Sequence, residues 1–169
     1  HLRRTQVIVR KLAHAMSQMD KFKKELPNEE IVEEYADAAP LHDIGKAGIT
    51  DGILQKPGTL TAEEREQMKK HTILGYRVRL SATRELNDNP MVIIAANIAK
   101  YHHEKWDGTG YPSGLSGTDI PLCARIMAVA DVYDALVSKR VYKDAIPHLE
   151  PIRIIREGAG KHFAPDVVK

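Results

Sequence analysis

One apolar segment, residues 122–136, constrains the fold more than any other part of the chain. Its sequence, LCARIMAVADVYDAL, is almost wholly apolar, so we expect a central helix that other elements cover on all sides. Asp131 interrupts this segment, and an unpaired buried carboxylate is costly. Arg125 is the nearest cation, but it is six positions away, on roughly the opposite side of a helix. The segment therefore predicts an interior polar site that includes Asp131.

The rest of the chain has the periodicity of helices and shows no strand pattern or internal repeat. Apolar residues recur every three or four positions from residue 2 to residue 26, which predicts one long opening helix. Further helices are expected over residues 31–39, 62–78, 90–103 and 149–157. The glycine-rich stretch 104–119 is expected to be an irregular loop. We predict an all-α fold, a compact bundle of roughly six to seven helices.

Local signals mark where several of these helices begin. Asn28 is a good N-cap, Thr61 and Glu64 form a capping box, and Pro90 suits the first position of a helix. Pro40 lacks a backbone donor, so the helix that contains it should kink or restart there.

Charge and composition exclude several classes of protein. The 25 lysines and arginines against 23 acidic residues give a formal net charge of +2, which argues against a partner that is a nucleic acid polymer. Cys123 is the only cysteine, so no internal disulfide forms and a reducing, cytoplasmic location is expected. The longest nearly apolar run, 91–99, is too short to insert across a membrane. We expect a single domain over residues 1–169, and because helical periodicity begins at once at His1, we take the chain to be a fragment of a longer protein.

Polar residues stand at several further positions where a buried apolar residue is expected. A histidine and an aspartate adjoin Leu41 and Ile44, and their burial is costly unless a partner satisfies both. A hydrogen bond between the two neighbours would be one solution, and a metal ion would be another. The candidate metal ligands over the whole chain are His1, His42, Asp43, His71, His102, His103 and Asp131. This set exceeds what one tetrahedral zinc needs, and it suits two metals about 3.5–4 Å apart. So many imidazoles favour iron or manganese over magnesium or calcium.

Four motifs together resemble the HD-GYP family. They are LHDIGK at 41–46, HHEKWDGTGYP at 102–112, ADVYDAL at 130–136 and RVYK at 140–143. The resemblance implies the HD-domain fold with a loop that contains the GYP motif. It also implies a metal-dependent phosphodiesterase that degrades the bacterial signalling molecule cyclic di-GMP.

The resemblance implies a role for each matching residue. His1, His42, Asp43 and Asp131 would form one metal site, and Asp43 would bridge to a second site completed by His71, His102 and His103. Some family members hold a third metal through a glutamate that precedes the first histidine, so the choice between two and three metals stays open. Lys46 would act with Asp43 in catalysis, beside the scissile phosphate. The residues implied in substrate binding are Lys46, Asp134, Arg140, Lys143, Gly110, Tyr111 and Pro112.

The implied reaction is hydrolysis of cyclic di-GMP to pGpG, and on to GMP, by hydroxide activated at two metals. Two alternatives stay open at this point. The chain could hydrolyse another cyclic dinucleotide such as cyclic GMP-AMP, or it could be a catalytically silent module that binds a nucleotide or a partner. The family resemblance also allows docking of GGDEF-domain proteins on the GYP loop, a homodimer, and a sensory or receiver domain upstream.

Overall fold

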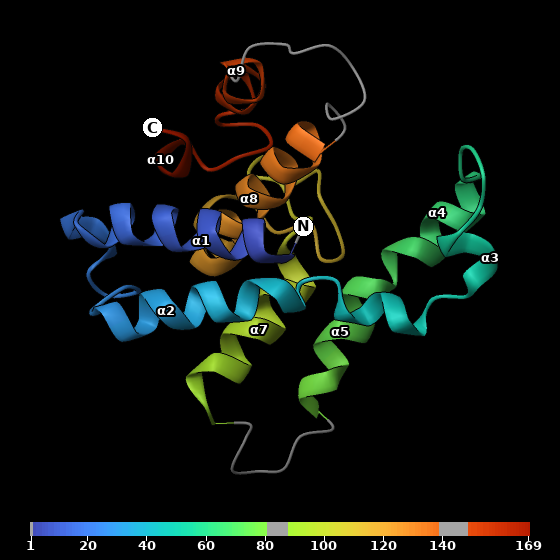
Figure 1. Ribbon diagram of the computed structural model, residues 1–169, viewed down its shortest axis with the longest axis horizontal. Helices are drawn as coiled ribbons and strands as arrows, with labels where there is room; N and C mark the ends of the chain where they lie inside the picture. Colours follow the sequence, from blue (N-terminus) through green and yellow to red (C-terminus); the bar gives the residue numbers. More distant parts are fainter. Residues whose placement is uncertain (1, 81–87, 139–148) are drawn as a thin grey trace.

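The computed structural model describes residues 2–80, 88–138 and 149–169, and these parts are helical (Figure 1). The α-helices are α1 (Leu2–Ser17), α2 (Glu29–Ala38), α3 (Asp51–Leu54), α4 (Ala62–Lys69), α5 (His71–Leu80), α7 (Pro90–Tyr101), α8 (Leu122–Ser138), α9 (Leu149–Glu157) and α10 (Pro165–Val168). Short 3-10 helices lie between some of them. The predicted all-α fold is confirmed.

Helix α8 is the centre of the molecule. Every residue from Leu122 to Ala130 is buried, as predicted, but the rest of the predicted segment is covered only in part and Ala135 is exposed. Helices α1, α7, α9 and α10 pack around it. The core that results contains Val9, Phe22, Ile98, Ile126 and Met127.

Two helix pairs build the remainder of the bundle. Helix α1 lies along α2, and α5 lies beside α7, with α2 and α7 in contact between the pairs (Figure 1). Helices α3 and α4 project from this body as an arm that joins it through α5. None of the described helices combines the length and the apolar character needed to cross a membrane.

The predicted capping residues begin their helices. The Asn28 side chain accepts a hydrogen bond from Ile31 N at 3.0 Å. Thr61 and Glu64 exchange the two bonds of a capping box, Glu64 N to Thr61 Oγ1 at 3.2 Å and Thr61 N to Glu64 Oε2 at 2.7 Å. Helix α7 has Pro90 at its first position. These starts confirm the predictions made from residue type alone.

The opening helix is shorter than predicted. It ends at Ser17, whose Oγ donates to His14 O at 2.8 Å, and Met19 adopts an extended conformation. Phe22 and Leu26 are nevertheless buried, because the chain folds back through a 3-10 turn. The apolar spacing identified core positions correctly, but it could not distinguish a continuous helix from a helix followed by a turn.

Candidate metal centre

The end of α2 delivers His42 and Asp43 to the interior. Pro40 lies in a 3-10 turn, Ala39–Leu41, which restarts the helix as predicted. His42 is fully buried, and its Nδ1 donates to Ala39 O at 2.8 Å. A second 3-10 helix, Ile44–Gly48, follows and packs against α5.

Gly45 sets the distance between this segment and α5. A Cβ atom at this position would lie 1.9 Å from His71 O and 2.4 Å from Gly75 N. Only glycine lets the two backbones approach so closely. The approach brings Asp43 next to the first residue of α5, His71.

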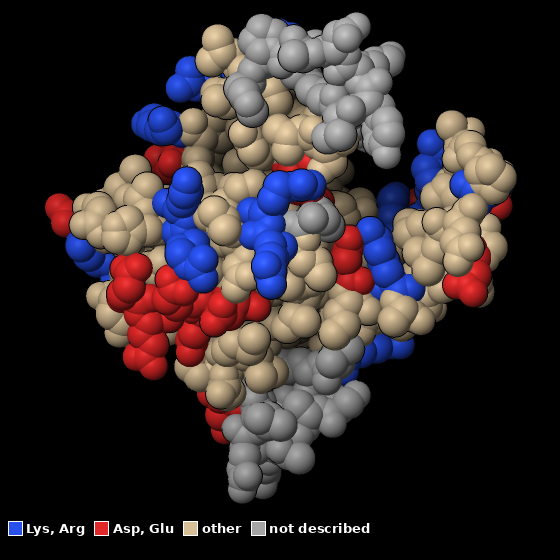
Figure 2. Space-filling view, in the orientation of Figure 1, with Lys and Arg blue, Asp and Glu red and all other residues tan. Residues whose placement is uncertain are grey.

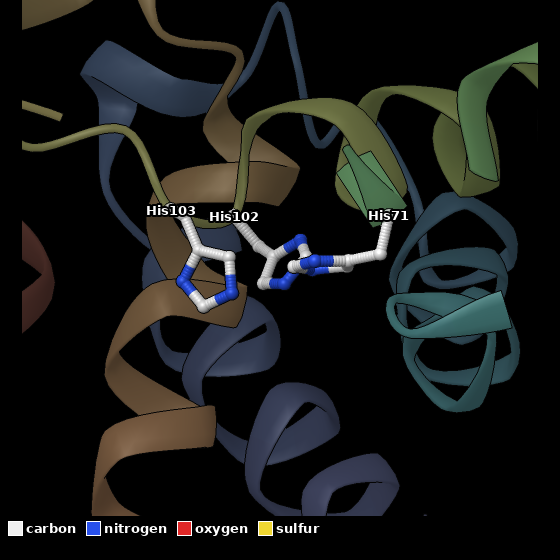
Figure 3. Close-up of side chains that lie close together, drawn as sticks. All are labelled: His71, His102 and His103. Atoms are coloured by element: carbon white, nitrogen blue, oxygen red, sulfur yellow. The ribbon is translucent and has the colours of Figure 1, made fainter. Parts of the chain in front are cut away.

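Three histidines from α5 and the end of α7 converge on one point (Figure 3). His71, His102 and His103 each offer a ring nitrogen, and these nitrogens lie within 4.8 Å of one another. Nδ1 of His71 donates to Met68 O at 2.7 Å, and Nδ1 of His102 donates to Ile98 O at 2.9 Å. Because a carbonyl only accepts, these bonds fix the proton on Nδ1 and leave a lone pair on Nε2. A backbone carbonyl on the far nitrogen is the usual support of a metal-binding histidine.

The Nε2 atoms of His71 and His102 test whether the site suits a cation. Both are buried, and neither has a hydrogen-bond partner among the residues that the structure describes. A buried polar atom without a partner is costly and calls for an explanation. A divalent cation that accepts the lone pairs supplies one, so the donor set fits a metal.

Asp43 lies between two sets of imidazoles. Its Oδ1 is 3.5 Å from His71 Nε2 and 3.9 Å from His102 Nε2. Its Oδ2 is 3.3 Å from His42 Nε2 and accepts a bond from Lys46 Nζ at 2.6 Å. One oxygen therefore faces His71 and His102, and the other faces His42.

The Asp131 carboxylate also faces His42. Its Oδ1 lies 3.7 Å from His42 Nε2, and it is the only α8 carboxylate that the described contacts bring to a histidine. Arg125 is not its counter-ion, because the Arg125 guanidinium lies over the Trp106 ring, 6.0 Å from the ring centroid. The aspartate in the apolar helix thus faces an interior polar site, as predicted.

The protonation states suit metal binding. Burial lowers the pKa of His103 to about 3 and holds the pKa of His102 well below its usual range, and burial also lowers the pKa of His71. Burial opposes ionisation of Asp43, but the nearby His42 imidazole and the hydrogen bond from Lys46 outweigh burial and hold the pKa of that carboxyl well below its usual range. At neutral pH these three imidazoles are therefore neutral and the Asp43 carboxylate is ionised, which are the forms that bind cations.

His42 differs from the other histidines in its charge balance. Burial lowers its pKa, but the nearby Asp43 and Asp131 carboxylates outweigh burial and raise it. Burial raises the pKa of Asp131 itself. Two carboxylates around His42 favour a positive charge at this point, and a cation can take the place of that proton.

The GYP loop packs on the histidine cluster. The Tyr111 ring stacks on His103, with centroids 4.8 Å apart and the planes at 27°, and Tyr111 N donates to His103 O at 3.2 Å. Gly110 allows this packing, because a Cβ there would lie 2.5 Å from Glu104 Cα. Pro112 follows Tyr111 in the same loop. The predicted loop residues thus lie beside the site.

Two residues of this region were not predicted to have a role. Glu104 is only 2% exposed, and its carboxylate accepts bonds from Ser113 N at 2.7 Å and Leu115 N at 3.1 Å, which fixes the GYP loop. The available signal for this anchoring role was the position of Glu104. It is an acidic residue that follows His102-His103 and precedes a glycine-rich stretch, whose backbone amides need acceptors. Arg4 is the second, because its Nε donates to Asp134 Oδ1 at 2.6 Å.

The remaining predicted residues divide into two groups. Lys46 lies at the site with its side chain 44% exposed, whereas Asp134 is 1% exposed and turned toward Arg4. His1, Arg140 and Lys143 lie outside the described residues, so their roles stay predictions.

Comparison with known proteins places this site in a family. The model of the HD domain matches residues 1–167. A protein named probable cyclic di-GMP phosphodiesterase from Vibrio cholerae serotype O1 is 49% identical over 99% of this chain and 38% of its own length. A cyclic di-GMP phosphodiesterase from Thermotoga maritima is 50% identical over 84% of this chain and 37% of its length. A V. cholerae protein named 3'3'-cGAMP-specific phosphodiesterase 2 is 40% identical over 100% of this chain and 30% of its length.

The chain spans about a third of the length of the curated relatives it matches. Among solved structures, a HDG"Y"P protein from Bdellovibrio bacteriovorus superposes with a TM-score of 0.65 over 99% of this chain and 50% of that chain, at 23% identity. The shared fold and the near-complete family match agree with the resemblance seen in the motifs. This chain belongs to the HD domain family.

Proposed function

We propose that this chain is the catalytic domain of a metal-dependent phosphodiesterase that hydrolyses cyclic di-GMP to pGpG and further to GMP. The observation that carries the proposal is the position of Asp43, whose Oδ1 faces His71 and His102 and whose Oδ2 faces His42. A carboxylate shared in this way suits a pair of cations that clamp a phosphodiester. Relatives named as cyclic di-GMP phosphodiesterases support this substrate.

The proposed ligands divide between two cations. His42, Asp131 and the predicted ligand His1 would hold one, and His71, His102 and His103 would hold the other, with Asp43 shared. Mixed nitrogen and oxygen donors favour iron or manganese, and a third metal stays open. Two bound cations would supply a nucleophile at neutral pH and neutralise charge on the phosphate.

The chain's own side chains prepare the site for this reaction. The backbone bonds to Nδ1 of His42, His71 and His102 hold the three rings in place. Tyr111 covers one face of His103. Lys46, which is bonded to Asp43 and half-exposed, would donate a hydrogen bond to a phosphate oxygen and a proton to the leaving 3′ oxygen.

Several predicted properties are part of the proposal without a structural argument of their own. Four properties stay predictions. They are phosphate binding by Arg140 and Lys143, docking of GGDEF-domain proteins on the GYP loop, a homodimer and a cytoplasmic location.

Product analysis tests the proposed function directly. Protein loaded anaerobically with Fe²⁺ or Mn²⁺ is incubated with cyclic di-GMP, and pGpG and GMP are separated from substrate by chromatography. We expect both products to appear and a chelator to stop the reaction. Loaded protein that binds cyclic di-GMP without cleaving it would instead indicate a signalling module.

Cyclic GMP-AMP is the second candidate substrate, because one relative at 40% identity is named as specific for it. We expect kcat/KM for cyclic di-GMP to exceed kcat/KM for cyclic GMP-AMP when the two are measured in parallel. The reverse order would assign the chain to the second substrate and leave the metal centre unchanged.

Lys46→Ala is expected to lower kcat by about 10²-fold to 10³-fold with little change in metal content, because a preorganised donor is lost at the reacting phosphate. Lys56→Ala is the matched control, since Lys56 Nζ also donates to a carboxylate, Glu64 Oε2, at 2.6 Å, but on the arm of α3 and α4. Kinetics with metal analysis check both variants. An unchanged kcat in Lys46→Ala would refute the role of Lys46.

A further inference from the structure

A half-exposed arginine binds a buried aspartate that lies about one helical turn from Asp131 on α8. The Arg4 side chain, on α1, is 55% exposed, although its Nε donates to the buried Asp134 Oδ1 at 2.6 Å. Its Nη2 also donates to Ser138 Oγ at 2.6 Å, so α8 holds one edge of the guanidinium at two points. The opposite edge includes Nη1, which makes no hydrogen bond to any residue in the described part of the chain.

This geometry suits the presentation of a cation to an anion. Asp134 is 1% exposed, so it is too enclosed to touch a substrate directly, and we expect it to act through the arginine that covers it. An arginine fork has five donors, and bonds along one edge leave the other free for two parallel bonds to a phosphate.

The position along α8 indicates which anion Arg4 can reach. Asp131 and Asp134 are three residues apart, so they lie on the same side of the helix, about one 5.4 Å turn from each other. Asp131 faces His42 in the metal centre, and Lys46 already provides a cation at Asp43. Arg4 is therefore displaced from the point of cleavage by about one turn, while a cyclic dinucleotide carries a second phosphodiester beside the one that is cut.

We propose that Arg4 binds the phosphate that is not cleaved, and that Asp134 is the positioning residue that orients it. The inference rests on the proposed function, because it requires a substrate with two phosphates. The sequence predicts that Asp134 binds the substrate, and under this inference it does so indirectly, by orienting Arg4.

Two substrates that differ in their number of phosphates test the inference. Cyclic di-GMP has two, and bis(p-nitrophenyl) phosphate has only the one that is cleaved. We expect Arg4→Ala to raise KM for cyclic di-GMP at least about tenfold more than KM for bis(p-nitrophenyl) phosphate. Asp134→Asn should shift the ratio of the two KM values in the same direction. Arg4→Lys keeps the charge without the fork, so it should give an intermediate ratio and serves if the alanine variant is poorly folded.

Arg10→Ala is the matched control. Arg10 is also on α1, and its Nε donates to a carboxylate, Glu33 Oε1, at 2.7 Å, but the pair joins α1 to α2. Figure 2 shows basic side chains over α1 beside a band of acidic side chains over α2, so this control removes a similar charge away from α8. Its ratio of KM values should equal that of the unmodified protein.

The outcomes separate this inference from the proposed function. If Arg4→Ala changes both substrates by the same factor, or neither, the arginine only joins two helices and the inference is overturned. Titration calorimetry measures the affinity for cyclic di-GMP, and this affinity distinguishes failure of the Arg4 role from failure of the proposed function. If the unmodified protein binds and cleaves cyclic di-GMP and Arg4→Ala retains its affinity, only the role of Arg4 fails. If the unmodified protein cleaves bis(p-nitrophenyl) phosphate but does not bind cyclic di-GMP, both fail.

Discussion

Asp43→Asn is expected to abolish turnover and to release metal from both halves of the site. Asparagine keeps the shape of the side chain but removes the negative charge that faces His71 and His102 through one oxygen and His42 through the other. We expect kcat/KM to fall by at least about three orders of magnitude, because several kcal/mol of stabilisation of the phosphate in the transition state are lost. Metal content by mass spectrometry and hydrolysis of cyclic di-GMP measure the two effects together.

Asp37→Asn is the control for the loss of one carboxylate. Asp37 is on α2, where its Oδ1 accepts a bond from Gln6 Nε2 at 2.8 Å on the surface. This variant should retain metal and activity. Loss of a single metal equivalent in Asp43→Asn, with the other retained at full affinity, would contradict a shared carboxylate.

The sequence predicted the centre of the fold because burial leaves a local signal. An apolar segment as long as 122–136 must be covered, and Asp131 within it must face something polar, whatever the rest of the chain does. The capping residues Asn28 and Thr61 were equally readable, because the bonds that they form close within three positions. The histidines of the cluster were found by residue type, and their convergence was expected from the number of such donors and from the family motifs.

The sequence could not predict contacts that depend on how distant segments meet. Arg4 and Asp134 are 130 positions apart, and neither stands in a local pattern that indicates its partner. The end of α1 at Ser17 was missed because apolar spacing continues through the turn that follows. Glu104 was missed as an anchor because its partners are backbone amides, which every residue offers, so only its position beside a glycine-rich stretch could have indicated its role.

Gly45→Ala is expected to cause the largest loss of stability among single substitutions at the site. The added methyl group would lie 1.9 Å from His71 O and 2.4 Å from Gly75 N, and both are backbone atoms of α5 that cannot rotate away. The 3-10 helix after Asp43 would have to move off α5. Overpacking of this kind costs about 3 kcal/mol or more, which corresponds to a fall in Tm of roughly 6–12 °C for a domain of this size. Thermal unfolding of the metal-free protein measures this cost.

Gly52→Ala is the matched control, because a Cβ at Gly52 meets nothing within 4 Å. Gly52 lies in α3, where alanine should be neutral or stabilise by up to about 1 kcal/mol. The comparison also tests how the site is built, since the segment that Gly45 holds against α5 carries Asp43 and α5 begins with His71. Movement of that segment should widen the 3.5 Å separation of Asp43 Oδ1 and His71 Nε2, so added Mn²⁺ should raise the Tm of Gly52→Ala more than that of Gly45→Ala. Equal increases in Tm for the two variants on addition of Mn²⁺ would show that the metal centre tolerates the displacement. Equal Tm values of the two variants without metal would show that the backbone at Gly45 is not in close contact with α5.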